Sequence, residues 1–284
     1  MTVLKKRKGT ETTRLITERN VPRISYTALE KYPWLINAFS TREGGVSTGI
    51  YSSMNLTFTR GDDPEKVREN FRIFGESIGV SIEQMVYSDQ QHTTNVMEVT
   101  SKHHGMGILR DRDFSDIDGI MTGEPGVCLV TSYADCVPLY FVDPVNRAIA
   151  ASHSGWRGTV GNICQSTVSE MNHLYGSKPE DIIACIGPSI CADCYEVGSD
   201  VADEFTKAYG EESGTVVLPH KENIPGKYQL DLTRANVINM EKAGILPEHI
   251  SVPDLCTCCN SDVLHSHRGS HGQRGGLCAF LMIK

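Results

Sequence analysis

The sequence predicts an α+β fold, because short apolar strands joined by turns alternate irregularly with single amphipathic helices. Three β-branched, apolar runs follow one another between residues 127 and 152. Helical patterns stand before and after these runs, but without the regular strand–helix alternation of a doubly wound sheet. No repeat or Pro/Gly-rich linker divides the 284 residues. We therefore expect a single domain over residues 1–284, with polar residues 1–14 as a flexible N-terminal tail.

The first expected elements are a strand over residues 35–40 and a helix over residues 64–78. The strand runs into a turn with glycines at 44 and 45, which permit positive φ. Asp63 stands at the cap position of the helix and Pro64 in its first turn. Apolar side chains then recur at helical spacing, at Val67, Phe71, Phe74 and Ile78.

The centre of the chain is predicted to form three strands over residues 127–133, 137–142 and 148–152, with a turn at 143–146. Cys136 then lies at the mouth of one strand and His153 at the end of the next. A hairpin between these two strands can bring both side chains to one ion.

A glycine-bearing turn at residues 155–158 leads into an expected helix over 159–174, which Gly176 ends. Such a turn at a helix N-terminus favours anions, and Arg157 would add a guanidinium suited to phosphate. Further on we expect strands at 182–186 and 277–283 and helices at 201–209 and 232–243, the last begun by Asp231.

The bulk properties exclude several classes of protein. A net charge of −8 argues against a large nucleic-acid surface. The longest apolar runs are too short to cross a bilayer, and no apolar run follows the basic N-terminus as in a secretory signal. The protein is therefore expected in the cytoplasm, where its ten cysteines would be reduced thiols. We expect a monomer or a small homo-oligomer.

His92, Cys136 and His153 together offer two imidazoles and one thiolate. That set is sufficient for a catalytic zinc whose fourth position stays open. The three residues are dispersed, so spacing alone does not select them, and composition alone favours Cys136 as a buried core filler.

The motifs as a set resemble the bacterial YfiH/YlmD family. Its members are known as multicopper polyphenol oxidase (laccase) domain proteins and are regarded as purine nucleoside phosphorylases. The resemblance covers nearly the whole chain from about residue 37. The matching segments are residues 39–47 (FSTREGGVS), 55–64, 89–92 (DQQH), 118–119 (DG), 134–138 (ADCVP), 153–158 (HSGWRG), 187–188 (GP), 256–257 (CT) and 266–268 (SHR).

The resemblance implies a four-layer α/β/β/α arrangement with mixed sheets and a zinc ion bound by His92, Cys136 and His153. It implies phosphorolysis of adenosine, inosine and S-methyl-5′-thioadenosine to the free base and ribose 1-phosphate, with a side activity that deaminates adenosine. Purine nucleosides and phosphate would then be the partners. The candidate contacts around the metal are Arg42 and Arg157 as catalytic residues, and Arg72, Trp156, His267 and Arg268 as substrate-binding residues.

The chain departs from the family pattern at two positions. Phe71 stands where family members commonly have an arginine, and Arg72 follows one place later. Ser154 replaces the alanine of the family's HAGWRG motif.

Other functions fit the same residues. Cys136 as a nucleophile with His153 as its base would make a metal-free cysteine hydrolase or deamidase. A metal-binding or partner-binding protein without turnover is a further hypothesis. His265, His267 and His271 suggest copper and a polyphenol oxidase, but a multicopper site needs several His-x-His pairs and the chain has one.

A second group of cysteines raises the alternative of a structural zinc site with four thiolate ligands. Cys191 and Cys194 form one pair, and Cys256, Cys258 and Cys259 lie further on. The fold would have to bring the two segments together, and the glycines typical of zinc knuckles are absent.

Overall fold

The computed structural model describes residues 4–6 and 11–284. Of the segment predicted to be a flexible tail, residues 1–3 and 7–10 lie outside the described residues. The described residues of that segment contact the body of the protein. Lys6 pairs with Leu255 in an isolated β-bridge, and its ammonium lies 3.0 Å from the buried Asp254 carboxylate. Thr13 begins the first strand.

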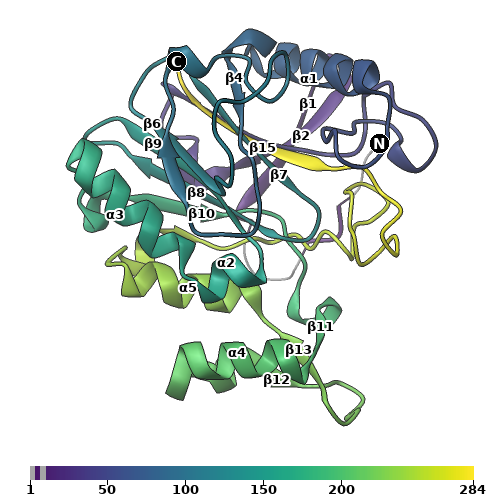
Figure 1. Ribbon diagram of the computed structural model, residues 1–284, viewed down its shortest axis with the longest axis vertical. Coiled ribbons are helices and arrows are strands. Elements are labelled where there is room, and N and C mark those ends of the chain that lie inside the picture. The colour runs from purple at the N-terminus through teal and green to yellow at the C-terminus, as the bar shows by residue number, and fades with distance from the viewer. Residues whose placement is uncertain (1–3, 7–10) are drawn as a thin grey trace.

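Two six-stranded sheets form the centre of the molecule (Figure 1). The first sheet is mixed. Strand β4 (Met85–Tyr87) pairs with β7 (Cys128–Tyr133) in parallel, whereas all other neighbouring strands in this sheet pair antiparallel. The C-terminal strand lies between β3 and β7, so residues far apart in the sequence share this sheet. Its strands, in order across the sheet, are β1 (Thr13–Glu18), β2 (Val21–Tyr26), β3 (Leu35–Ser40), β15 (Leu277–Ile283), β7 (Cys128–Tyr133) and β4 (Met85–Tyr87).

The second sheet carries the central hairpin that the sequence predicts. In this hairpin β8 pairs antiparallel with β9, and Pro138 stands opposite His153. Cys136, which directly precedes β8, is therefore held close to the end of β9. The strands in order are β14 (Ile250–Ser251), β10 (Ile183–Ile186), β8 (Val137–Asp143), β9 (Ala148–Ser154), β6 (Gly119–Thr122) and β5 (Val96–Glu98).

Helices cover the outer faces of both sheets, which confirms the α/β/β/α arrangement (Figure 1). The helix α1 (Pro64–Ile78) packs on the first sheet. On the outer face of the second sheet lie α2 (Trp156–Val160), α3 (Ile163–Tyr175) and α5 (Leu232–Lys242). A separate apolar core, with Phe39, Leu129 and Tyr140 among its members, fills the space between the two sheets.

The sequence signals of α1 act as expected. The Asp63 carboxylate accepts a hydrogen bond from Glu65 N, and Gly79 ends the helix at φ 75°. Phe71 and Phe74 are fully buried on the sheet-facing side. Burial of each ring contributes about 1.5–3 kcal/mol, which holds the helix on the sheet.

A small antiparallel sheet extends from the end of the molecule, together with α4 (Ser199–Tyr209) (Figure 1). Its strands are β11 (Glu196–Gly198), β13 (Lys227–Leu230) and β12 (Val217–Pro219). The side chain of Phe205 on α4 is fully buried in the core that α3 and α5 share. Among the described residues, no helix has both the length and the apolar character that crossing a membrane requires.

One predicted helix is wrong in its extent. The segment over 159–174 forms two helices, α2 and α3, with a break at Gly161 and Asn162. Asn162 adopts φ 60° and its side chain accepts a hydrogen bond from Gln165 N, so it caps a new helix. A side chain that competes for local backbone donors favours a helix start over a helix interior.

Candidate active site

His92, Cys136 and His153 come together at one edge of the two sheets. Their ligand atoms lie within 4.8 Å of one another. The two imidazole rings are 4.8 Å apart between centroids and nearly perpendicular, at 86°. His153 is buried, whereas His92 is exposed, so the cluster can be reached from the His92 side. Two imidazoles and a thiolate around an accessible point fit a catalytic zinc with an open position.

Asp118 orients this cluster. Its carboxylate is fully buried and lies 2.7 Å from Nδ1 of His153, which leaves Nε2 of that ring for a metal. The same carboxylate accepts hydrogen bonds from the backbone N–H groups of Gln91, His92 and Thr93 at 2.9–3.1 Å. It thereby fixes the loop that carries His92, where His92 itself adopts φ 66°. A carboxylate behind a metal-binding histidine is a common feature of zinc sites.

Asp118 is ionised in this setting. Burial opposes its ionisation, but the hydrogen bond and charge of His153 and the backbone N–H groups outweigh burial. The pKa of Asp118 is therefore lowered from its ordinary value. The negative charge in turn stabilises the ring orientation that presents Nε2 of His153.

We expect Asp118→Asn to weaken metal binding by about 10–100-fold, because the amide keeps the shape but loses the charge that orients His153. The measurement is competition of the variant with a chelating dye for zinc. The control is Asp116→Asn, which changes a carboxylate on the same loop outside the cluster. Unchanged zinc affinity in Asp118→Asn would contradict this role.

The surroundings of Cys136 favour the thiolate form of its side chain. Burial opposes the charge, but the positive charge and hydrogen bond of His153 and the contact with His92 lower the pKa of Cys136 to about 6. The thiolate in turn raises the pKa of His153, against the effect of its own burial. A thiolate at neutral pH can act as a metal ligand or as a nucleophile.

Backbone geometry around the cluster demands particular residues. A Cβ on Gly155 would lie 2.7 Å from Cδ2 of His92, so only glycine lets that ring approach. Asp135 adopts φ 85° beside Cys136. Its carboxylate accepts hydrogen bonds from Thr257 Oγ1 at 2.6 Å and from Arg268 N at 2.7 Å, which hold this strained residue in place.

Ser154, which departs from the family motif, fits without disturbing the site. Its side chain is fully buried behind the cluster. Its hydroxyl donates to Asn236 Oδ1 at 2.9 Å and lies 2.8 Å from Thr159 Oγ1. The extra oxygen is thus satisfied within the protein.

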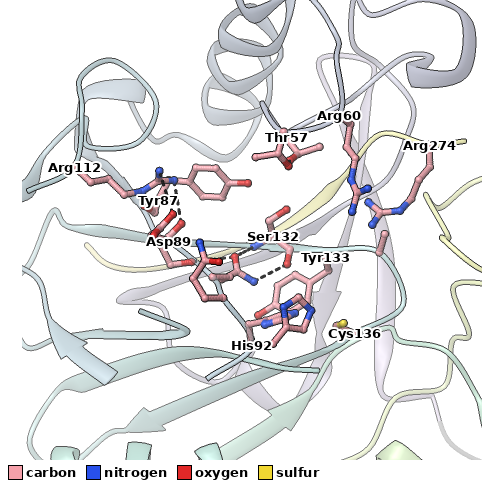
Figure 2. Close-up of a pocket in the computed structure, with 16 residues that line it drawn as sticks. Thr57, Arg60, Tyr87, Asp89, His92, Arg112, Ser132, Tyr133, Cys136 and Arg274 are labelled. Atoms are coloured by element: carbon pink, nitrogen blue, oxygen red, sulfur yellow. Dashed lines mark hydrogen bonds and ion pairs between the residues drawn. The ribbon is translucent and has the colours of Figure 1, made fainter. Parts of the chain in front are cut away.

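The cluster forms part of the wall of a cavity of about 240 Å³ (Figure 2). Polar side chains dominate the lining, and three arginines take part. The lining residues are Thr57, Thr59, Arg60, Tyr87, Ser88, Asp89, Gln90, Gln91, His92, Arg112, Ser132, Tyr133, Ala134, Cys136, His153 and Arg274.

Arg60 and Arg274 form a pair of neighbouring cations on this wall. Figure 2 shows their guanidinium groups close together on the side of the cavity that holds Cys136. Partial burial and the charge of Arg60 lower the pKa of Arg274 to about 10. Within the described residues, Nε of Arg274 finds no hydrogen-bond acceptor, and Nη1 donates only to the adjacent Gly275 carbonyl. Adjacent guanidinium groups with spare donors are suited to an anion with several oxygens, such as phosphate.

Arg112 has a different role on the opposite wall. Its guanidinium donates to the carbonyls of Tyr87 at 2.7 Å and Ser88 at 3.0 Å, and it lies 3.8 Å from Asp89. These contacts satisfy its charge and shape the wall (Figure 2).

None of the four arginines expected from the sequence is among the residues that line the cavity. Arg42 donates to the carbonyls of Ser52 and Ser261, so it fastens two loops. Arg72 is exposed on α1, where it pairs with Glu69 and Glu76. Phe71, one place earlier, is buried, so the family's arginine position belongs to the core in this chain.

The other expected contacts also lie outside the lining. Arg157 is exposed and its guanidinium lies 4.3 Å from the ring centre of Trp156, which packs against the helical core. Arg268 donates to the carbonyls of Cys194 and Glu196. His267 is exposed beyond the cavity wall. The turn at 155–158 packs closely against His92 through Gly155, and anion binding by this turn stays a prediction.

Sequence reasoning missed Arg60, Arg274 and Asp118. Arg60 and Asp118 lie within segments that carry the family resemblance. Arginine and aspartate are common elsewhere in the chain, so residue type alone does not single these two out. Arg274 comes six residues after Arg268 in a glycine-rich segment, and only the fold shows which of the two faces the cavity.

The histidines that suggested copper do not gather. Within residues 4–6 and 11–284, the groups that could hold a metal are His92–Cys136–His153 and a set of four cysteines, and neither includes His265, His267 or His271. His265 is buried, and burial together with Arg42 and Arg274 lowers its pKa to about 3.

Comparison with known proteins shows which family the chain resembles over most of its length. Residues 36–284 match the family described as multi-copper polyphenol oxidoreductase laccase. The chain is 36% identical over 250 residues to the purine nucleoside phosphorylase YlmD of Geobacillus stearothermophilus, covering 87% of this chain and 89% of that protein. It is 33% identical over 235 residues to adenosine deaminase RL5 of an unknown prokaryotic organism, covering 82% and 88%.

A solved structure shares the fold. The crystal structure of the Bacillus licheniformis hypothetical protein YfiH superposes with a TM-score of 0.89 at 30% identity, covering 97% of this chain and 100% of that one. The likeness extends over both sheets and the helices on either side.

Proposed function

The chain belongs to the multi-copper polyphenol oxidoreductase laccase family, and from that premise we propose that it is a zinc-dependent purine nucleoside phosphorylase. The observation that carries the proposal is one cavity that combines the His92–Cys136–His153 cluster with the arginine pair. A phosphorylase needs a site for phosphate beside a site that assists cleavage of the sugar–base bond. The relative from Geobacillus stearothermophilus bears the name purine nucleoside phosphorylase.

In the proposed reaction, Arg60 and Arg274 hold phosphate with its charge neutralised and an oxygen directed at C1′ of the ribose. The C1′–N9 bond breaks as the C1′–O bond forms, and its electron pair leaves with the purine base, which takes up the proton that phosphate gives up. The sugar product is ribose 1-phosphate from adenosine and inosine, and 5-S-methyl-5-thioribose 1-phosphate from S-methyl-5′-thioadenosine. Zinc held by His92, Cys136 and His153 would supply Lewis acidity toward an oxygen of the bound reactants. The cavity walls fix the two reactants relative to each other. We propose adenosine, inosine and S-methyl-5′-thioadenosine as substrates.

Deamination of adenosine is a second proposed activity, because one relative is named an adenosine deaminase. Water bound near the same cluster would add to C6 of adenine, and ammonia would leave as inosine forms. Attack at C6 does not require phosphate, so the two activities can be separated by omitting it.

The cysteine hydrolase alternative has a specific basis in the Cys136, His153 and Asp118 arrangement, which resembles a nucleophile–base–carboxylate triad. His92 argues against it. A hydrolase triad has no need of a second imidazole directed at the same sulfur, whereas a metal ion requires ligands that converge from several directions.

The test is chromatography of inosine incubated with the zinc-loaded protein, with and without phosphate. We expect hypoxanthine only when phosphate is present, together with an equal amount of ribose 1-phosphate. Release that is independent of phosphate would indicate hydrolysis. Absence of turnover of inosine, adenosine and S-methyl-5′-thioadenosine by zinc-loaded protein would refute the proposal.

A further inference from the structure

A second group of possible metal ligands lies outside the catalytic cavity. The Sγ atoms of Cys191, Cys194, Cys256 and Cys259 lie within 4.8 Å of one another. They come from the loop between β10 and β11 and from the turn that follows β14, two segments that the fold places side by side. Ser189 forms a β-bridge with Cys256, and Thr257 N donates to the Ser189 carbonyl. The fold therefore brings together the two cysteine-containing segments, which the sequence alone could not establish.

We propose that these four cysteines bind a structural zinc ion. Four thiolates at about 2.3 Å from one ion stand about 3.8 Å from each other in a tetrahedron. The Sγ atoms of Cys194 and Cys259 are already 3.5 Å apart. All four ligands come from the protein, so this site is closed, in contrast to the three-ligand cluster in the cavity. Four sulfur ligands in this geometry select zinc or iron over harder ions.

The backbone around Cys256 supplies an independent indication of a metal-bound thiolate. Its Sγ accepts hydrogen bonds from the N–H of Cys191 at 3.3 Å and from the N–H of Cys259 at 3.4 Å. A neutral thiol is a weak acceptor, and two N–H donors directed at one sulfur favour the charged form. Because the N–H of Cys259 donates to Sγ of Cys256, the turn at 256–259 folds back toward the sulfur of its first residue, although it contains no glycine.

Nearby charge suits such a site. Zinc with four thiolates carries a net charge of about −2. The guanidinium of Arg268 donates to the Cys194 carbonyl at 3.2 Å and the Glu196 carbonyl at 2.9 Å, which places a cation beside the cluster. Arg268, which the sequence analysis offers as a substrate-binding residue, makes these two hydrogen bonds in the structure.

The four-cysteine cluster is connected to the active site through Asp135, the residue before Cys136. Thr257, between two of the cysteines, donates to the Asp135 carboxylate, and Ile190 N donates to the Asp135 carbonyl at 3.0 Å. Asp135 directly precedes Cys136 and has a strained backbone. A zinc ion that joins the segments 191–194 and 256–259 would hold this turn, and with it the position of Cys136.

The decisive preparation is the Cys136→Ala variant, loaded with zinc under reducing conditions and freed of excess metal. It lacks a ligand of the proposed catalytic site, so its retained zinc reports on the second site whether or not the protein is a phosphorylase. We expect about one zinc ion per chain by elemental analysis. Adding Cys259→Ser, at an exposed position, should remove it, whereas adding Cys258→Ser, the neighbouring cysteine outside the cluster, should leave it.

A second measurement keeps all four cysteines intact. Cobalt(II) bound to Cys136→Ala should show the intense sulfur-to-metal absorption of a four-thiolate tetrahedral site. Removal of the metal should lower Tm by about 5 °C or more. No retained metal in reduced Cys136→Ala, retained iron in place of zinc, or a Cys194–Cys259 disulfide in peptides from protein purified without reductant would overturn the proposal.

Discussion

Cys136→Ala is expected to lower kcat/KM for phosphate-dependent cleavage of inosine by more than ~100-fold. Substitution of a residue that hydrogen-bonds a metal ligand lowers metal affinity or activity by up to ~100-fold. Cys136 is proposed as a ligand itself, so its loss should cost more. The variant leaves two imidazoles, which bind zinc more weakly than the complete set. The measurement is initial rate at several inosine concentrations, together with the zinc content of the variant.

Further variants separate a ligand from a nucleophile at this position. Cys136→Asp supplies a carboxylate oxygen as zinc ligand in place of the sulfur and has no thiol, so we expect it to recover part of the activity that Cys136→Ala loses. Zinc should also protect Cys136 of the wild-type protein from iodoacetamide, and removal of zinc should expose it. The cysteine hydrolase hypothesis predicts the opposite, namely full activity after chelation and rapid inactivation by alkylation. Cys258→Ala, outside both clusters, serves as the control.

The elements whose signals are local were predicted closely from the sequence. The helix Pro64–Ile78 and the strand Leu277–Ile283 have the predicted bounds, because a cap, a helix-ending glycine and a continuous apolar run act over a few residues. The break between α2 and α3 was missed because Asn162 adopts a left-handed conformation, which periodicity does not reveal.

Part of the candidate metal cluster could be predicted from the sequence, whereas the proximity of Arg60 and Arg274 could not. Two of the three ligands belong to one hairpin, whose turn and strands can be predicted from the sequence. Arg60 and Arg274 reach the cavity from segments that precede α1 and β15, and their proximity depends on the order of strands in the first sheet. The sequence instead favoured Arg42 and, through the family pattern, Arg72, whose guanidinium groups have other partners in the structure.

Arg274→Ala is expected to raise the KM for phosphate by about 10–100-fold, with a smaller effect on the KM for inosine. A hydrogen bond to a charged group contributes about 1.5–3 kcal/mol, and each ~1.4 kcal/mol corresponds to a tenfold change in affinity. Among the described residues, Nη1 of Arg274 donates only to the neighbouring Gly275 carbonyl, so loss of this side chain removes little that the fold needs. Arg60→Ala should act in the same direction. Phosphate dependence of the initial rate, at saturating inosine, measures both effects.

Arg72→Ala is the matched control, because it removes the same charge from an exposed helix and breaks only surface ion pairs with Glu69 and Glu76. Its KM for phosphate should equal that of the wild-type protein. Arg274→Lys should restore part of the affinity, since an ammonium supplies the charge without the planar pair of donors. If Arg274→Ala retains its zinc and its Tm but binds phosphate normally, the anion site lies elsewhere in the cavity. If Arg72→Ala instead raises the KM for phosphate, Arg72 takes over the role of the family's arginine and the assignment of phosphate to Arg60 and Arg274 is wrong.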